Sequence, residues 1–244
     1  MSKRTTAWGA WVVLAGVLAV LGCSPDRPPQ PAAGPPAPPL EPAAEPATEP
    51  EPKQPIPIEV PKELAPQPTA IPEVKLSEAL SATCKIGVGD PLPEATLPAA
   101  DGKNVSIRDV RGEAATVVLF WTAGETDTSK KIAASILADI QADAVSAYGA
   151  RTVNAVAINQ RDSAETAAEI FAQAKVGFPM LMDPGGNYFA QVATERLPRI
   201  YVLDHDGKIA WFDVDYSETT RRILKDVLRV IAGEPQPAAQ PRGQ

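Results

Sequence analysis

Apolar residues follow two different patterns between residues 86 and 233. Ala115–Trp121 and Met180–Met182 are unbroken apolar runs between polar residues, which is typical of strands buried on both faces. Three other segments carry apolar residues at helical spacing, and they are Thr128–Tyr148, Ser163–Lys175 and Ser217–Ala232. Because the two kinds of segment alternate, the pattern predicts a layered α/β domain with helices on both faces of a sheet.

Turn signals complete the predicted order of elements. Further strands are predicted at Glu94–Leu97, Val105–Ile107, Arg151–Asn159, Arg199–Asp204 and Ile209–Val214, and short helices at Leu76–Thr83 and Tyr188–Val192. The last two strands flank His205-Asp206-Gly207, whose Asp-Gly pair favours a hairpin. Asp162 precedes the second long helix, and with Glu165 three residues later it has the spacing of a capping box. A final hairpin beside alternating strands and helices indicates a mixed sheet.

Residues 24–75 differ in composition from the rest of the chain. They hold 18 of the 27 prolines and no aromatic residue, so they cannot bury enough apolar surface to offset the entropy of ordering. Proline also favours extended geometry, which predicts a disordered, semi-rigid tether. Its favoured role is to space the domain from a membrane, and binding to proline-recognising proteins or the cell wall is the alternative. Residues 76–85 connect it to the domain, and 234–244 form a disordered tail.

The first 23 residues have the features of a bacterial secretion signal. Lys3 and Arg4 precede an apolar stretch over residues 8–21, which is short for a membrane span. Gly22-Cys23 ends this stretch and resembles the lipobox, in which the cysteine is acylated and becomes the mature N-terminus. The resemblance implies that Cys23 anchors the chain by lipid to the inner or outer membrane, with the domain outside the cytoplasm. A plain signal peptide or an uncleaved anchor is the alternative.

Charge and composition argue against several function classes. The net charge is −7, whereas a nucleic-acid-binding surface needs clustered Lys and Arg. One histidine and two widely separated cysteines argue against a zinc site built from His and Cys. Asp183, Asp204 and Asp206 each lie near a turn glycine or proline, so turn formation accounts for them without a metal. The sequence therefore predicts no metal, no cofactor and no nucleic-acid partner.

Four segments carry a family resemblance in the order in which they occur. They are Ile86–Asp101, Val117–Trp121, Phe178–Pro184 and Leu197–Lys208. Together they resemble the redoxin domains, which include membrane-anchored thioredoxin-like thiol–disulfide oxidoreductases and the alkyl-hydroperoxide-reductase/thiol-specific-antioxidant proteins. The resemblance implies a thioredoxin-like three-layer fold with a central mixed sheet over residues 86–233. It also implies a cis peptide bond before Pro198, which stands where the family has a cis-proline against its active site.

The catalytic motif of that family is missing. In thioredoxin-like members, a strand ending in Phe-Trp leads to Cys-x-x-Cys at a helix N-terminus, where the helix dipole favours a thiolate. Counted from Phe120-Trp121, Glu125 takes the place of the first cysteine and Thr128 that of the second. No cysteine follows Lys85, so we expect the usual redox chemistry to be absent. Glu125, Asp127 and Thr128 then have helix capping as their favoured role, because acid–base catalysis here lacks a nucleophile or metal partner.

Cys84 is the remaining thiol of the chain. If Cys23 is acylated, Cys84 has no partner within the chain and is either free or paired with a second chain by a cross-chain disulfide. The favoured function is a binding or scaffold module that engages a protein segment in a groove near Pro198 and Glu125. The alternatives are a thiol oxidoreductase or antioxidant that uses Cys84, and a passive envelope tether.

Overall fold

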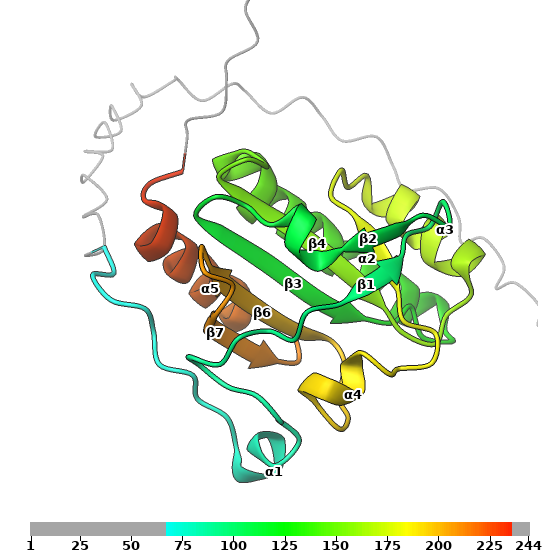
Figure 1. Cartoon of the computed structure of the whole chain (residues 1–244), viewed down its shortest axis with the longest axis horizontal. Coiled ribbons are helices and arrows are strands. Elements are labelled where there is room, and N and C mark those ends of the chain that lie inside the picture. The colour runs from blue at the N-terminus through cyan, green and yellow to red at the C-terminus, as the bar shows by residue number, and fades with distance from the viewer. Residues whose placement is uncertain (1–66, 236–244) are drawn as a thin grey trace, which may run out of the picture. The chain divides into compact units, whose positions relative to one another are not determined.

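The computed structural model describes residues 67–235, so the predicted signal segment, Cys23, most of the tether and nearly all of the tail lie outside the described residues. At its centre is a five-stranded sheet with the order β5-β4-β3-β6-β7 (Figure 1). Its strands are β3 (Ala115–Trp121), β4 (Val153–Asn159), β5 (Met180–Met182), β6 (Arg199–Asp204) and β7 (Ile209–Val214). The first three run parallel, whereas β6 and β7 are antiparallel to their neighbours. The sheet is therefore mixed, as predicted.

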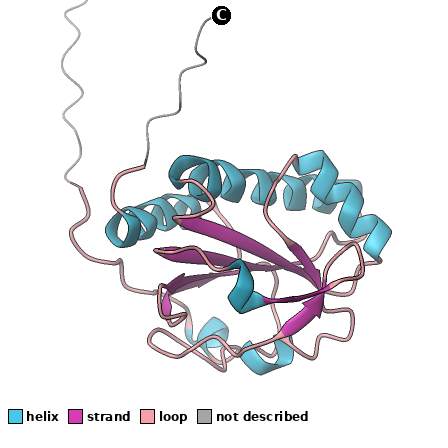
Figure 2. Cartoon of the chain, turned by 45° about the horizontal axis from the view of Figure 1, so that its top comes forward, coloured by secondary structure: helices cyan, strands magenta, loops and turns pink. Residues whose placement is uncertain are grey.

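Helices and a small hairpin cover the two faces of this sheet (Figure 2). One face holds α2 (Asp127–Ile140), its π-helical continuation (Gln141–Ser146), α3 (Ala164–Ala174) and α5 (Glu218–Ala232). The other face holds α4 (Phe189–Val192), the 3-10 helix Ile107–Val110, and the hairpin of β1 (Thr96–Pro98) and β2 (Asn104–Ser106). This arrangement confirms the predicted three-layer α/β fold.

β3 shows why both faces of the sheet are covered. All of its residues are buried, and successive side chains point to opposite faces. Val117, Leu119 and Trp121 pack with the long helices, whereas Val118 and Phe120 pack with the hairpin and α4. Each large apolar side chain buried in this way contributes about 1.5–3 kcal/mol to folding. The central strand therefore fixes the position of the loop that follows it.

The ordered domain begins earlier than predicted. We expected a disordered tether through residue 75, but Val74 contacts both hydrophobic clusters and Leu76 contacts one of them. Exposure alternates along this segment, because Pro72, Val74 and Leu76 are half-buried and the residues between them are exposed. The high proline content concealed this two-residue period. The helix that follows is a single turn, α1 (Glu78–Ser81), and is shorter than the predicted one.

Two long helices are capped by residues other than the predicted ones. α3 begins after Ser163, whose hydroxyl accepts a hydrogen bond from the Thr166 backbone N–H at 3.2 Å, and Asp162 takes no part in this cap. α2 begins after Thr126, whose hydroxyl accepts the Ser129 N–H at 3.1 Å while the Ser129 hydroxyl accepts the Thr126 N–H. Both caps lie close to the predicted positions in sequence, and they leave Asp162 free to bond to the loop that follows β3.

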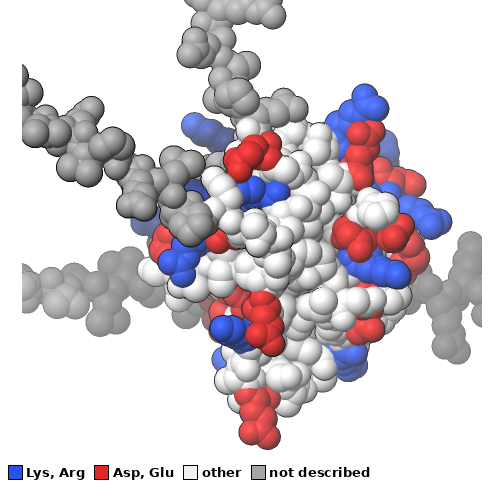
Figure 3. All heavy atoms as spheres, turned by 90° about the vertical axis from the view of Figure 1, so that its left-hand side faces the viewer, with Lys and Arg blue, Asp and Glu red and all other residues white. Residues whose placement is uncertain are grey.

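The face shown in Figure 3 mixes the two signs of charge. Lys and Arg side chains lie among Asp and Glu side chains, with uncharged surface between them. Binding to a phosphate backbone needs clustered basic side chains, and this face shows no such cluster. The absence of a nucleic-acid partner stays a prediction. Within residues 67–235, no helix has the length and the hydrophobicity that a membrane span requires.

Candidate functional site

A cavity lies where β3 ends and α2 begins. Its volume is about 190 Å³, and its wall includes Trp121 at the end of β3, Ile132 and Ile136 of α2, and Leu197-Pro198. The peptide bond between Leu197 and Pro198 is cis, which is the geometry that the family resemblance implies. The resemblance also places the catalytic motif at this point of the fold. The cavity is therefore the candidate site.

Asp162 holds the loop between β3 and α2. Its carboxylate accepts the Ala123 backbone N–H at 2.6 Å, the Thr122 hydroxyl at 3.2 Å and the Asn159 side-chain amide at 2.7 Å. Hydrogen bonds that involve a charged group contribute about 1.5–3 kcal/mol each, so Asp162 fixes this part of the cavity wall. We expected Asp162 to cap α3, because the sequence does not show that the ends of β3 and β4 lie side by side.

The residues at the two cysteine positions do not line the cavity. Glu125 and Thr128 are exposed, and neither belongs to the cavity wall. Capping of α2 falls to Thr126, while Asp127 adds a negative charge to the first turn, where the helix dipole favours it. Pro198 therefore lines the cavity and Glu125 does not. A partner groove near these two residues stays a prediction.

Gly124 allows the tight entry into α2. Its φ of 71° lies in the left-handed region, which glycine adopts at little cost. A Cβ added at this position would lie 2.6 Å from the hydroxyl oxygen of Ser129, and that hydroxyl belongs to the capping box. A larger residue would therefore disturb both the cap of α2 and the cavity wall, to which Gly124 and Ser129 belong.

Cys84 lies on the opposite face of the sheet from the cavity. It packs against the hydrophobic cluster that contains Phe120 and Tyr201, whereas the cavity borders the cluster that contains Trp121. The thiol is free and half-buried, and Cys84 does not belong to the cavity wall. The structure therefore separates this sulfur from the place where the family's cysteines would stand.

Arg199 is the neighbour of Cys84 that the sequence analysis missed. Its fully buried guanidinium donates to the Cys84 sulfur at 3.2 Å, to the Thr83 hydroxyl and to nearby backbone carbonyl oxygens. Among the described residues, no carboxylate accepts a hydrogen bond from it. Lys85, the residue next to Cys84 in the sequence, donates to the carbonyl oxygen of Ala190. The available signal was Arg199 itself, a charged residue at the start of a strand whose inner residues are apolar.

Tyr201 lies beside Arg199 and Cys84. Its hydroxyl is buried and has no hydrogen-bond partner among the described residues. Burial raises the pKa of the Tyr201 hydroxyl, and the adjacent Arg199 guanidinium acts against this rise. Cys84, Arg199 and Tyr201 therefore form a polar cluster within the apolar layer between the sheet and α4.

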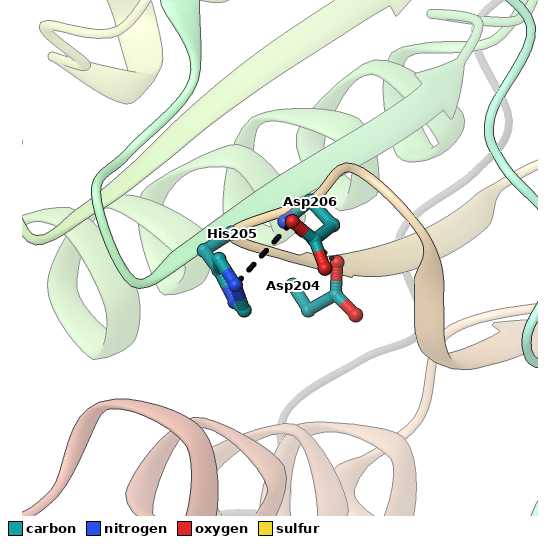
Figure 4. Close-up of side chains that lie close together, drawn as sticks. All are labelled: Asp204, His205 and Asp206. Atoms are coloured by element: carbon teal, nitrogen blue, oxygen red, sulfur yellow. Dashed lines mark hydrogen bonds and ion pairs between the residues drawn. The ribbon is translucent and has the colours of Figure 1, made fainter.

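The turn between β6 and β7 brings Asp204, His205 and Asp206 together (Figure 4). His205 Nε2 lies 3.4 Å from the Asp206 carboxylate, and both side chains are largely exposed. The Asp204 carboxylate accepts the backbone N–H groups of Asp206 at 3.0 Å and Lys208 at 2.9 Å, as aspartates in turns do. Asp183 likewise accepts the backbone N–H groups at the start of α4. Turn formation therefore accounts for these residues.

Comparisons with known proteins identify relatives of this chain. The family model described as "AhpC/TSA family" matches residues 88–212. A protein of Mycobacterium tuberculosis strain H37Rv, named "Putative peroxiredoxin Rv2521", is 28% identical over 162 residues. The match spans 61% of this chain and 99% of that protein.

A solved structure shows the same fold. The solution structure of "a putative protein disulfide isomerase from Bacteroides thetaiotaomicron" matches with a TM-score of 0.54 at 20% identity, and covers 62% of this chain and 94% of that one. This likeness confirms the thioredoxin-like arrangement of the layers. The matched family model spans more than half of the 244 residues, and the redoxin resemblance drawn from four sequence segments points to the same group. The chain therefore belongs to the AhpC/TSA family.

Proposed function

We propose that this chain is a lipid-anchored, extracytoplasmic redoxin domain that binds an extended segment of a protein partner and carries out no thiol–disulfide exchange at the family's usual site. The observation that carries the proposal is a cavity beside Pro198 with no sulfur in its wall. Cys84 is the one cysteine among residues 67–235, and it packs on the opposite face of the sheet. Without a thiolate, neither disulfide exchange nor thiol-based peroxide reduction can begin in this cavity.

The cavity wall favours an apolar side chain of the partner. Trp121, Ile136 and Pro198 are among its lining residues. Ile132 belongs to the same wall and is 56% exposed, so a large apolar side chain stands uncovered at this point of α2. Burying a partner side chain of the size of Leu or Ile here would contribute about 1.5–3 kcal/mol to binding. This contact would also cover Ile132.

Leu197 supplies backbone groups that an extended segment can use. It lines the cavity, and within residues 67–235 neither its N–H nor its C=O is hydrogen-bonded to another backbone group. An extended peptide can pair with such groups as an added strand does, while one of its alternate side chains enters a pocket. A protein segment is therefore favoured over a small apolar ligand.

The membrane part of the proposal rests on the sequence. The basic pair Lys3-Arg4, the apolar stretch and Gly22-Cys23 together support acylation of Cys23. The proline-rich residues that follow would then hold the domain away from the membrane surface. In this arrangement, the domain meets its partner outside the cytoplasm.

One observation favours a second candidate function, in which Cys84 is a reactive thiol. Arg199 donates to its sulfur at 3.2 Å, and reactive thiols are found beside cations. Half-burial leaves part of Cys84 accessible to a reactant. A Cys84→Ser variant separates the two candidates, because peptide binding beside Pro198 does not need this sulfur.

Replacing Ile132 with Glu tests the proposed binding mode. We expect the affinity for short extended peptides with a central Leu, Ile or Met to fall roughly tenfold or more, because a carboxylate at the cavity wall would be desolvated by the bound side chain. The measurement is fluorescence anisotropy of labelled peptides, selected from an array by the full-length chain in detergent solution.

Val88→Glu is the matched control for this experiment. Val88 is 57% exposed, compared with 56% for Ile132, and it lies outside the cavity wall. The control should bind the selected peptides as the wild-type chain does. An equal loss of peptide affinity in Ile132→Glu and Val88→Glu, or an unchanged affinity in Ile132→Glu, would contradict binding in this cavity.

A further inference from the structure

A second cavity opens at the carboxyl ends of β4 and β5. Its volume is about 370 Å³, and its wall is formed by Gln160 and Arg161 after β4, by residues 184–186 after β5, by α4 and by Lys85. In open α/β sheets, the crevice outside the carboxyl ends of the strands is where ligands bind. The two cavities share no lining residue. This second cavity is therefore a separate candidate site.

Two cations in its wall have unused hydrogen-bond donors. The Lys85 ammonium donates to the carbonyl oxygen of Ala190 at 2.6 Å, and two of its three donors remain available. Arg161 is exposed, and none of the side-chain hydrogen bonds or ion pairs within residues 67–235 involves it. The guanidinium group presents several donors in one plane, which suits a group with two oxygens.

No carboxylate belongs to the wall of this cavity. The acidic group in contact with the wall is Asp183, which is 4% exposed and accepts the backbone N–H groups of Tyr188 at 3.3 Å and Phe189 at 2.9 Å. Gln160 is 1% exposed, and its side-chain amide makes one long hydrogen bond of 3.5 Å, to Asp183. A buried amide with so weak a partner can donate to a ligand in the cavity.

The backbone fixes Arg161 at the edge of the cavity. Its φ of 69° lies in the left-handed region, which residues other than Gly, Asn and Asp seldom adopt. The next residue, Asp162, is held by its hydrogen bonds to Ala123 and Asn159, so the loop cannot relax without losing them. Backbone strain of this kind persists where the surrounding structure enforces it, and it is concentrated at functional sites.

We propose that this cavity binds the phosphate or carboxylate group of a small molecule between Lys85 and Arg161. The side-chain amide of Gln160, which also lines the cavity, would supply further hydrogen bonds to the ligand. The ligand class is an oxyanion because the wall offers two positive charges and polar donors, and no acidic side chain. The site is distinct from the peptide-binding cavity, and the inference does not depend on the proposed function.

Isothermal titration calorimetry tests this site with inorganic phosphate and with malonate as probes. The full-length chain is titrated in detergent solution at low ionic strength, where screening of charged ligands is weak. We expect saturable binding of at least one probe, with an affinity about tenfold weaker in Arg161→Gln and in Lys85→Met. Two variants from different parts of the wall keep the test informative if one of them folds poorly.

Arg196→Gln is the matched control. Arg196 is also an exposed arginine with a left-handed φ, 73°, and it lies outside the cavity wall. The Arg196→Gln variant should have the same affinity for each probe as the wild-type chain. Binding of phosphate alone or malonate alone would support the site and identify the ligand group. The inference would be overturned by a lack of saturable binding of both probes, or by equal losses in Arg196→Gln and Arg161→Gln.

Discussion

The Glu125→Cys, Thr128→Cys double variant, made on a Cys84→Ser background, is expected to reduce insulin disulfides. The two positions lie at the N-terminus of α2 and are exposed, so cysteines there would be accessible to a disulfide substrate. A helix N-terminus lowers the pKa of a cysteine from about 8.5 toward about 7, which gives roughly tenfold more thiolate at neutral pH. Pro198 already lines the cavity beside this loop.

The matched control carries serine at both positions on the same Cys84→Ser background, and it should stay at the uncatalysed rate of insulin reduction. Turbidity of the precipitating insulin chains gives the rate, and mass spectrometry shows whether the new cysteines form a disulfide. Activity in the double-cysteine variant, with none in the double-serine control, would mean that the surrounding fold can still support the reaction. The wild-type chain would then lack only the two cysteine sulfur atoms. A disulfide that forms without any turnover would contradict that conclusion.

Gly112→Ala is expected to destabilise the domain by about 3 kcal/mol or more, because overpacking against rigid neighbours is costly. A Cβ at Gly112 would lie 2.6 Å from the backbone nitrogen of Asn154 and 2.8 Å from the carbonyl oxygen of Thr152, and closer still to the carbonyl oxygen of Ala115. All three atoms belong to the backbone where β3 and β4 begin. No side-chain rotation can relieve these contacts, so the backbone at Gly112 would have to move away from the starts of both strands.

Gly177→Ala is the control for this prediction. Its added Cβ would have its nearest neighbour, the Gln141 side chain, at 3.8 Å, which is ordinary van der Waals contact. Its free energy of unfolding should stay within about 0.5 kcal/mol of the wild-type value. Urea denaturation followed by tryptophan fluorescence measures both variants. A Gly112→Ala chain as stable as Gly177→Ala would contradict the close approach of Gly112 to the backbone at the starts of β3 and β4.

Most of the sheet could be predicted because its strands carry a strong local signal. The bounds of β3, β5, β6 and β7 agree with the predicted ranges. The apolar runs of β3 and β5 were clear because burial on both faces leaves few polar residues within a strand. The turn before β7 was also evident from Asp206-Gly207. Helix starts were less certain, because Ser, Thr and Asp stand side by side before α2 and α3, and any of them can cap a helix.

The contacts of the candidate sites were harder to predict, because they join residues far apart in the chain. Asp162 has the sequence context of a helix cap, yet it bonds to the loop after β3, 39 residues away. Arg199 reaches Cys84 across 115 residues. Lys85 and Arg161 come to one cavity only because α4 and two loops meet at the sheet edge. Local patterns carry no information on such pairings.

The central claim is that this chain carries out no thiol–disulfide exchange or peroxide reduction at the family's usual site. Its most direct test is a combined assay of insulin reduction and peroxide consumption by the wild-type full-length chain and by a Cys84→Ser variant. We expect no turnover in either protein, because the cavity beside Pro198 holds no thiol. This result would leave peptide binding as the function of the cavity. Turnover by the wild-type chain that disappears in Cys84→Ser would contradict the claim, and would make this chain a redox protein that works through the thiol held by Arg199.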